Sequence, residues 1–379
     1  MNILMISVDK KIFDENSAVR QRMFNYGMLV NKLYIIVLNK KSENATPGKE
    51  MKIAKNIWIF PTNSSSKFAY MLDAVKIASK LRDIDLVTSQ DPYEIGLIAW
   101  RIAKKLKTKL EFQIHTDIFN PYFIKHSIAN RMRSAAANFL LPKADCLRAV
   151  SKRIKKSLPE KLQEKTVVLP IFTDLARIQQ TRVGLNLHKQ YPRFKFIILM
   201  MSRLEKEKNI SMAIAAMQKV TAIFPKTGLI IIGAGSSRKT LRRQVRRAGL
   251  EENIIFKKWT NDPLTYYKTA DLFLSSSDYE GYGLSLVEAI ASHCPVLTTK
   301  VGIAGEILSS NNSLLCDVGD RACFVRNLVK AQQYPALLSQ FKEKAYTDLV
   351  QKTYRTEGEY LNALQKSWFD TINKKVKLN

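Results

Sequence analysis

The chain has 379 residues, of which 46% are hydrophobic and 25% charged, with only 14 Gly and 12 Pro. This length exceeds the about 100 to 200 residues of one ordinary domain and predicts two domains. The composition excludes long disordered tracts. The formal net charge of +28 favours binding of polyanions, but it does not distinguish phospholipid, nucleic acid and nucleotide. A basic surface that is only solvated explains the charge about as well.

The first half of the chain alternates short apolar runs with longer amphipathic segments. This alternation is typical of parallel strands whose sheet is covered by helices on both faces. We therefore expect a doubly wound, Rossmann-like α/β domain over residues 1–175. Its predicted strands are residues 3–8, 33–38, 57–60, 86–89, 110–114 and 146–150, with helical spacing at 67–81 and 95–106.

The first nine residues have no basic flank before their apolar run and turn polar at Asp9. This pattern favours a buried first strand over a signal peptide. No apolar run approaches the roughly 18 to 20 residues that span a bilayer. We therefore expect a cytoplasmic protein.

The same alternation restarts in the second half and predicts a second Rossmann-like domain over residues 176–350. A linker is expected near residues 169–192. The segment 351–379 has helical, amphipathic spacing, and we expect it to cross back to the first domain. The predicted strands of the second domain are residues 194–201, 229–232, 254–256, 272–275 and 296–298.

The cysteines show no spacing that indicates a bound metal or a disulfide framework. They form no Cys-x-x-Cys pair and no paired-ligand pattern with the four histidines. We expect neither a zinc site nor disulfides. The four residues are Cys146, Cys294, Cys316 and Cys323.

Two strand ends of the second half carry candidate phosphate ligands, because ligands of open parallel sheets bind beyond the carboxyl ends of strands. Arg203 and Lys208 lie five residues apart, where a guanidinium fork and a point charge could hold one diphosphate. Gly233 and Gly235 let a backbone approach a ligand or make a tight turn. Each signal alone is weak, since basic residues are abundant here and a lone Gly-x-Gly is more often only a turn.

The segment 275–289 is the most specific feature of the sequence. A strand ends in small polar residues, a carboxylate and two glycines, and a helix begins near Leu284 with a second carboxylate in its second turn. Backbone amides at this helix N-terminus suit a phosphate. Glu280 can accept hydrogen bonds from sugar hydroxyls, and Glu288 from a ribose diol. The candidate donor-binding residues here are Glu280, Gly281, Tyr282, Gly283, Leu284 and Glu288.

With these motifs the second half resembles the retaining GT-B glycosyltransferases of family 4, over about residues 196–320. The family's two glutamates separated by seven residues are met by Glu280 and Glu288. Its Ser-Arg-Leu segment followed by Lys-Asn is met by residues 202–204 and 208–209. The resemblance implies a GT-B fold, which is α/β with two Rossmann-like doubly wound domains facing a central cleft.

The resemblance also implies a function, namely a retaining, metal-independent hexosyltransferase that takes its sugar from a UDP- or GDP-linked donor. Arg203 and Lys208 would hold the donor diphosphate and take up the negative charge of the departing nucleotide, in place of a metal ion. Glu288 would bind the ribose and Glu280 the transferred sugar. The leaving phosphate would act as base in a front-face attack, so neither a protein nucleophile nor a cofactor is required.

In the first domain the resemblance is thinner. His115 ends a predicted strand where the family places a histidine facing the donor sugar, and Asp117 follows it. The family's glycine-rich turn after the first strand is replaced by residues 9–20. Small residues at Ser17 and Ala18, with Arg20 one turn later, would shape the acceptor site there.

Two residues depart from the family pattern, and one segment is similar to a metal-binding motif. His293 and Lys258 stand where the family commonly has glycine, at positions that shape a turn and the nucleotide base pocket. The base preference is therefore open. Asp83-Ile84-Asp85 resembles a metal-binding Asp-x-Asp but precedes a strand instead of ending one, so we expect no metal there.

Basic segments at residues 104–109 and 152–156, with aromatic and basic side chains over 122–141, suggest contact with an anionic membrane. The expected acceptor is then a glycan or a lipid-linked precursor, and the enzyme would lie at the inner face of the membrane. One alternative is a nucleic-acid-binding protein, for which no recognition motif is present. Others are a non-catalytic partner of an active transferase, a GT-B epimerase and a phosphorylase.

Overall fold

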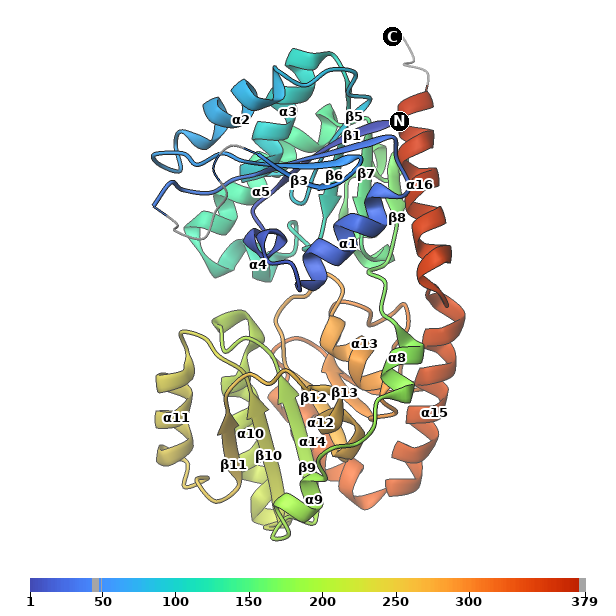
Figure 1. Ribbon diagram of the computed structural model, residues 1–379. Coiled ribbons are helices and arrows are strands. Elements are labelled where there is room, and N and C mark those ends of the chain that lie inside the picture. The colour runs from blue at the N-terminus through green and yellow to red at the C-terminus, as the bar shows by residue number, and fades with distance from the viewer. Residues whose placement is uncertain (43–47, 49, 375–379) are drawn as a thin grey trace. The chain divides into compact units, whose positions relative to one another are not determined.

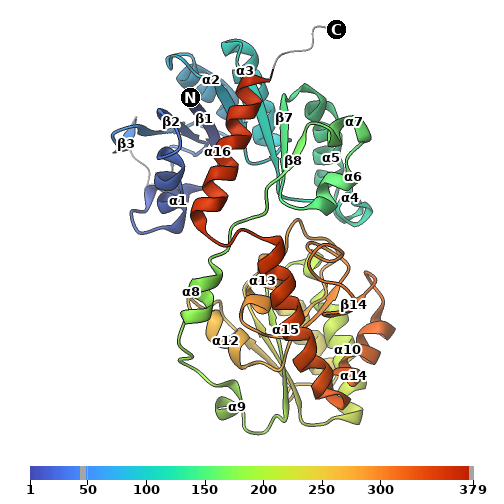
Figure 2. The same ribbon diagram turned by 90° about the vertical axis from the view of Figure 1, so that its right-hand side faces the viewer.

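The computed structural model describes residues 1–42, 48 and 50–374 (Figures 1 and 2). The chain divides into two compact units. Unit 1 comprises Met1–Pro170 together with Glu357–Asn379, and unit 2 comprises Ile171–Thr356. Each unit contains one mainly or wholly parallel sheet with helices, which is the Rossmann-like α/β architecture expected from the strand and helix alternation.

The sheet of unit 1 has eight strands in the order β3-β4-β2-β1-β5-β6-β7-β8. All neighbours pair in parallel except β3 and β4, which pair antiparallel around an irregularity between Lys52 and Ala54. The strands are β1 (Asn2–Ser7), β2 (Lys32–Val37), β3 (Met51–Ala54), β4 (Ile57–Pro61), β5 (Leu86–Ser89), β6 (Lys109–Ile114), β7 (Cys146–Ala149) and β8 (Thr166–Val168).

The helices of unit 1 form two groups. Helix α3 contacts both α2 and α5, and the final helix α16 contacts β6. Figure 2 shows α16 running across the sheet beside α1. The elements are η1 (Lys10–Phe13), α1 (Ala18–Gly27), α2 (Tyr70–Ala78), α3 (Glu94–Leu106), α4 (Pro121–His126), α5 (Ile128–Leu140), η2 (Leu141–Lys143), α6 (Lys152–Ser157), α7 (Glu160–Gln163) and α16 (Glu357–Asn373).

Aromatic contacts attach α16 to unit 1. The Trp368 ring is fully buried and meets the Tyr26 ring edge-on, with centroids 5.8 Å apart. The Tyr26 and Tyr360 hydroxyls lie 3.1 Å apart, and Gln365 donates a hydrogen bond to the Leu29 carbonyl. Burial of an aromatic side chain of this size stabilises a fold by several kcal/mol, so α16 is part of the core of unit 1.

The sheet of unit 2 has six parallel strands in the order β11-β10-β9-β12-β13-β14. The strands are β9 (Phe196–Met201), β10 (Thr227–Ile232), β11 (Ile254–Lys257), β12 (Leu272–Ser275), β13 (Val296–Thr299) and β14 (Leu314–Cys316). The helices are α8 (Leu175–Gln180), α9 (Leu187–Gln190), η3 (Lys206–Lys208), α10 (Ile210–Ile223), α11 (Arg238–Arg247), α12 (Leu264–Thr269), α13 (Leu284–Ala291), α14 (Arg321–Gln333) and α15 (Pro335–Lys352).

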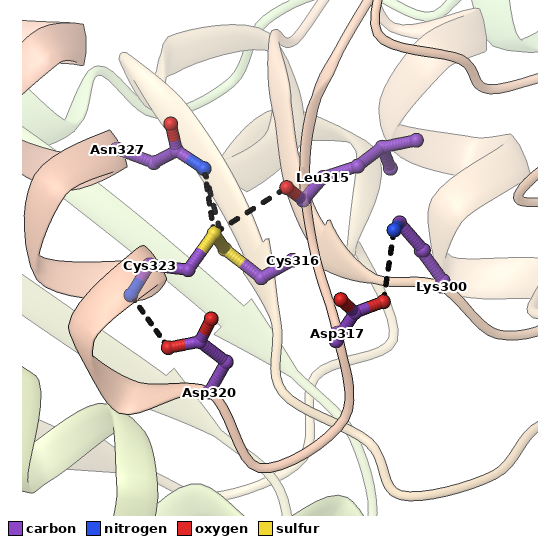
Figure 3. Close-up of a disulfide and its surroundings, with 7 residues drawn as sticks. All are labelled: Lys300, Leu315, Cys316, Asp317, Asp320, Cys323 and Asn327. Atoms are coloured by element: carbon purple, nitrogen blue, oxygen red, sulfur yellow. Dashed lines mark hydrogen bonds and ion pairs between the residues drawn. A yellow bond between two sulfur atoms is a disulfide. The ribbon is translucent and has the colours of Figure 1, made fainter.

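Figure 3 shows a disulfide between Cys316, at the end of β14, and Cys323, in the first turn of α14. The expectation that the chain holds no disulfide is wrong for this pair. Asp320 caps the helix by accepting a hydrogen bond from the Cys323 amide, and Asn327 donates toward both sulfur atoms. The tight turn from strand to helix brings the two residues together, which their spacing alone does not indicate. Cys146 and Cys294 are buried free thiols.

Across the described ranges, no helix is both long and apolar enough to cross a membrane.

Candidate functional site

Lys208 and Glu280 form an ion pair at the carboxyl edge of the unit 2 sheet. Lys208 follows β9 and Glu280 follows the neighbouring strand β12, so the parallel order brings residues 72 positions apart into contact. The Lys208 Nζ to Glu280 Oε1 distance is 2.5 Å, and the two side chains are only 13% and 17% exposed. Ser277 donates a second hydrogen bond to the same carboxylate oxygen at 2.8 Å.

The loops that carry this pair are joined by further hydrogen bonds. Asn209, in the left-handed conformation at φ +44°, donates from its side chain to Asp278 at 2.8 Å. The Ser276 hydroxyl donates to the carbonyls of Lys208 and Asn209, and the Asp278 amide donates to the Glu207 carbonyl. The cation and the carboxylate are therefore held by a fixed backbone and not by their own contact alone.

Arg203 lies on the loop after β9 with its side chain 72% exposed. Its guanidinium donates to Glu207 at 2.8 Å; the Glu207 side chain is only 10% exposed, whereas the exposed Arg203 group remains accessible to a ligand. Gly233 and Gly235 allow this loop to lie close to β10. A Cβ at these two positions would come within 1.9 Å of the Ser202 carbonyl oxygen and 2.4 Å of the Leu204 carbonyl oxygen.

The helix α13 begins directly after this edge. Its N-cap, Gly283, has φ +89° and no capping side chain, so the helix start offers backbone amides and the positive end of its dipole. The first helical residue, Leu284, is 42% exposed, whereas Tyr282 is buried. Among the described residues the Tyr282 hydroxyl has no hydrogen-bond partner. Gly281 is buried beside it.

Glu288 lies in the second turn of α13 and accepts a hydrogen bond from the Tyr267 hydroxyl of α12 at 3.1 Å. Burial raises the pKa of Glu288, and the Tyr267 hydrogen bond opposes that rise. Tyr267 is only 1% exposed and packs edge-on against Phe273. Tyr267 could not be predicted from the sequence, because nothing there indicates which of two adjacent tyrosines, Tyr266 or Tyr267, points toward α13.

In unit 1, His115 follows β6 and reaches the surface. Its Nε2 lies 3.1 Å from the side-chain oxygen of Gln113. Although the residue keeps exposed surface, the protein packed around its ring desolvates it, and this desolvation, followed by the charges of Arg148 and Arg22, lowers the pKa of His115 to about 4. The ring is therefore neutral at physiological pH and can accept or donate a hydrogen bond.

Asp117 is buried in the loop after β6. Its Oδ1 has no hydrogen-bond partner in the described part of the chain. Burial raises its pKa, and hydrogen bonds from Ser157 and Asn120 oppose the rise. A buried carboxylate oxygen without a partner is costly and suits a ligand hydroxyl.

The residues Ser17, Ala18 and Arg20 form the start of α1. Ser17 is its N-cap and accepts from the Arg20 amide, and its hydroxyl donates to the carbonyls of Lys11 and Asp14. The Arg20 guanidinium is mostly buried and pairs with Glu15 at 3.4 Å. Contacts within this loop thus account for the Ser17 hydroxyl, whereas the Arg20 guanidinium also lies against the sulfur of Met51 in β3; Ala18 is the first helical residue.

The departures from the family pattern have local explanations. His293 has φ +53°, the left-handed conformation that favours glycine, and its ring stacks on Tyr346 of α15. It also pairs with Glu343 at 3.3 Å, so it belongs to the turn after α13. Asp85 accepts a hydrogen bond from the Asn2 amide at the amino edge of the unit 1 sheet, opposite the edge of His115. Lys258 is exposed directly after β11.

Two family models match the chain. The model described as "Glycosyl transferases group 1" matches residues 187–348, and the model described as "Glycosyltransferase Family 4" matches residues 40–177. The first match covers the sheet edge with Arg203, Lys208, Glu280 and Glu288. The second covers His115 and Asp117.

Among curated relatives, the chain is 27% identical over 249 residues to an alpha-monoglucosyldiacylglycerol synthase of Streptococcus pneumoniae. The match covers 61% of this chain and about half, 55%, of that enzyme.

Two solved structures share the fold. The sucrose-phosphate synthase of Thermosynechococcus elongatus superimposes with a TM-score of 0.80 at 14% identity, covering 98% of this chain and 99% of that one. Anabaena Alr3699/HepE in complex with UDP and glucose gives a TM-score of 0.74 at 17% identity, covering 98% and 100%.

Proposed function

Because the chain belongs to the GT-B glycosyltransferases of the group 1/family 4 type, we propose that it moves a hexose-type sugar, with retention of configuration, from a UDP- or GDP-linked donor. The acceptor is a hydroxyl of a glycan or of a lipid-linked precursor. The observation that carries the proposal is the Lys208–Glu280 pair beside the N-terminus of α13. It places a cation, a carboxylate and a helix dipole at one edge of one sheet.

The pair suggests how donor binding prepares the site. A diphosphate competes with Glu280 for the Lys208 ammonium, and the freed carboxylate then accepts hydrogen bonds from hydroxyls of the transferred sugar. Arg203 exchanges Glu207 for the same diphosphate. The two cations and the α13 dipole stabilise the charge that develops on the departing nucleotide, without an essential divalent ion. Gly281 to Leu284 would border the phosphates, and Glu288 would bind the ribose.

The proposed acceptor side is in unit 1. Asp117 offers an unpartnered carboxylate oxygen suited to an acceptor hydroxyl, whereas His115, with its neutral ring, is proposed as a catalytic residue that hydrogen-bonds a hydroxyl of the transferred sugar or orients the acceptor. The turn of Ser17, Ala18 and Arg20 follows β1, and β5 separates β1 from β6, the strand that precedes Asp117. The turn would therefore border the acceptor at the same edge of the sheet. The loop's own contacts suggest that it supports the site and does not react.

We propose that exposed apolar side chains of unit 1 face a membrane, which would suit a lipid-linked acceptor. Ile128, Met132 and Phe139 recur at helical spacing on α5 and are 75%, 69% and 55% exposed. Phe68 and Leu72, at the start of α2, are 96% and 74% exposed. Lys143 Nζ lies 4.1 Å from the centroid of the Phe139 ring, and Lys104 Nζ lies 5.8 Å from that of Trp100, which packs edge-on against Phe139. Lys67 and Arg131 are sequence neighbours of Phe68 and Met132.

Exposed apolar side chains with cations around them suit an anionic bilayer surface, and one relative carries a diacylglycerol product in its name. The proposed location is therefore the inner face of the membrane. An Ile128→Ser, Met132→Ser variant should sediment less with vesicles rich in phosphatidylglycerol. Met28→Ser, also an exposed apolar residue of unit 1, should bind as the parent does. Equal loss in both variants would argue against this surface.

The donor assignment is tested by thermal shift in EDTA with UDP, GDP, ADP and their hexose conjugates. One nucleotide series should stabilise the protein, and Glu288→Ala and Arg203→Ala should lose that effect. Lys206→Ala, which removes an exposed cation from the same turn as Lys208, is the matched control and should keep it. If no nucleotide binds, with or without added metal, the transferase proposal fails, and binding to DNA beyond that of an equally charged control would favour the nucleic-acid alternative.

A further inference from the structure

The sheet of unit 1 contains a buried ion pair that the proposed reaction does not use. Glu111 of β6 is 0% exposed and Arg148 of β7 is 5% exposed, with 3.9 Å between Glu111 Oε1 and Arg148 Nε. Removing two charges from water costs several kcal/mol for each ion, which a contact at this distance does not recover alone. A hydrophobic pair would fill the same space at lower cost, so the polar residues require an explanation.

These charges belong to a row of polar side chains that leads to His115. Successive residues of a strand alternate between faces, so Glu111 and Gln113 share one face of β6. Thr88 of β5 lies directly opposite Glu111 in the register. The Thr88 hydroxyl donates to Glu111 Oε1 at 2.8 Å, and the Gln113 amide donates to Thr88 Oγ1 at 3.1 Å. Both Thr88 and Gln113 are almost fully buried.

The direction of each hydrogen bond in this row is determined by counting protons. The Thr88 hydroxyl has one proton, which it gives to the Glu111 carboxylate, so toward Gln113 it can only accept. The NH₂ group of Gln113 must therefore face Thr88, and its carbonyl oxygen must face His115. A flipped amide would divide the one hydroxyl proton between the Glu111 and Gln113 oxygens and leave Thr88 Oγ1 without a donor, whereas the unflipped amide gives two full hydrogen bonds. The amide oxygen can only accept, so His115 Nε2 must carry the ring proton.

We propose that Glu111, Thr88 and Gln113 are positioning residues that hold His115 as the Nε2-protonated tautomer, with Nδ1 as the ring's hydrogen-bond acceptor. In this form His115 receives a hydrogen bond from a substrate hydroxyl and cannot donate one from Nδ1. Arg148 is the counter-ion of the Glu111 carboxylate. Because that carboxylate can only accept hydrogen bonds, it determines the direction of the hydrogen bonds from Thr88 to His115. The role of His115 toward substrate rests on the proposed function, whereas its tautomer does not.

The tautomer is measured on the full, ligand-free chain by ¹⁵N NMR of the histidine rings at pH 7.5, where a ring with a pKa near 4 is neutral. His115→Asn identifies its signals among the four histidines. The wild type should show a protonated Nε2 and an unprotonated Nδ1 at His115. A protonated Nδ1 would overturn the proposal, and this comparison needs no variant of the buried row.

Two variants test the relay itself. Thr88→Val removes the hydroxyl but keeps the side-chain shape, so the Gln113 amide can rotate and the His115 signals should change to those of mixed tautomers. Thr88→Ser retains the hydroxyl and should keep the wild-type signals. A Thr88→Val spectrum with unchanged His115 signals would contradict the relay. Failure of the wild type to transfer any sugar would instead count against the proposed function and leave the tautomer result intact.

Discussion

Tyr267→Phe removes one hydroxyl from the proposed ribose site and little else. The ring is 1% exposed and packs edge-on against Phe273, with centroids 5.2 Å apart, so phenylalanine keeps this packing. What is lost is the hydrogen bond of 3.1 Å to the Glu288 carboxylate. A hydrogen bond to a charged group contributes about 1.5 to 3 kcal/mol. We expect about half of this to appear in nucleotide binding, since water can reach the half-buried Glu288.

A loss close to half of the upper value, about 1.4 kcal/mol, weakens binding about tenfold. Isothermal titration calorimetry should therefore show a Kd for the preferred nucleoside diphosphate about tenfold higher in Tyr267→Phe. The 2′,3′-dideoxy nucleotide lacks the ribose hydroxyls and should bind both proteins with nearly the same Kd. Tyr334→Phe, at an exposed tyrosine of the same unit, is the control. An equal loss for both nucleotides would refute the ribose role of Glu288.

Three further predictions concern unit 2. Lys208→Ala leaves the carboxylate of Glu280, which is 17% exposed, without its cation. We therefore expect urea titration to show an unfolding free energy lower by about 2 kcal/mol, together with a large loss of diphosphate affinity. The control variant Lys206→Ala should show neither effect. The raised pKa of Glu288 means that the carboxylate takes up a proton at higher pH than in the unfolded chain, where Glu has a pKa of about 4.3. Folding therefore gains stability from Glu288 as pH falls through the raised pKa, while nucleotide affinity falls over the same range; affinity that stays constant down to pH 4.3 would contradict this. Reduction of the Cys316–Cys323 disulfide should lower the unfolding free energy by about 2 kcal/mol, as expected for a short closed loop, and Cys323→Ser should abolish the response to reductant.

The elements that the sequence predicted are those with strong apolar runs. The strands β1, β9 and β10 consist almost wholly of buried apolar residues, so their pattern is unambiguous. The strands β3, β8 and β14 were missed because all three are short edge strands, and side chains of each stay partly exposed. Four-residue strands inside a sheet, such as β5 and β12, are fully buried and were predicted. The motifs that carry the family resemblance could be recognised for a similar reason. Each lies in one short continuous segment, made of the end of a strand and the start of the helix that follows.

The pairings across the sheet could not be predicted from the sequence. Lys208 and Glu280 are both recognisable, yet their contact depends on β9 and β12 being neighbours. Thr88 and Gln113 looked like ordinary strand residues, because their significance comes from the register of β5 on β6 and from burial. The Cys316–Cys323 bond likewise depends on the turn between β14 and α14.

We propose above all that the carboxyl edge of the unit 2 sheet activates a sugar nucleotide. The most direct test incubates the protein in EDTA with UDP- and GDP-hexoses and a lipid-linked or glycan acceptor, and measures nucleoside diphosphate release together with the anomeric configuration of the product. We predict release from one donor class with a retained anomer, reduced at least a hundredfold by Lys208→Ala and unchanged by Lys206→Ala. An inverted product, or release that Lys208→Ala leaves intact, would contradict the account.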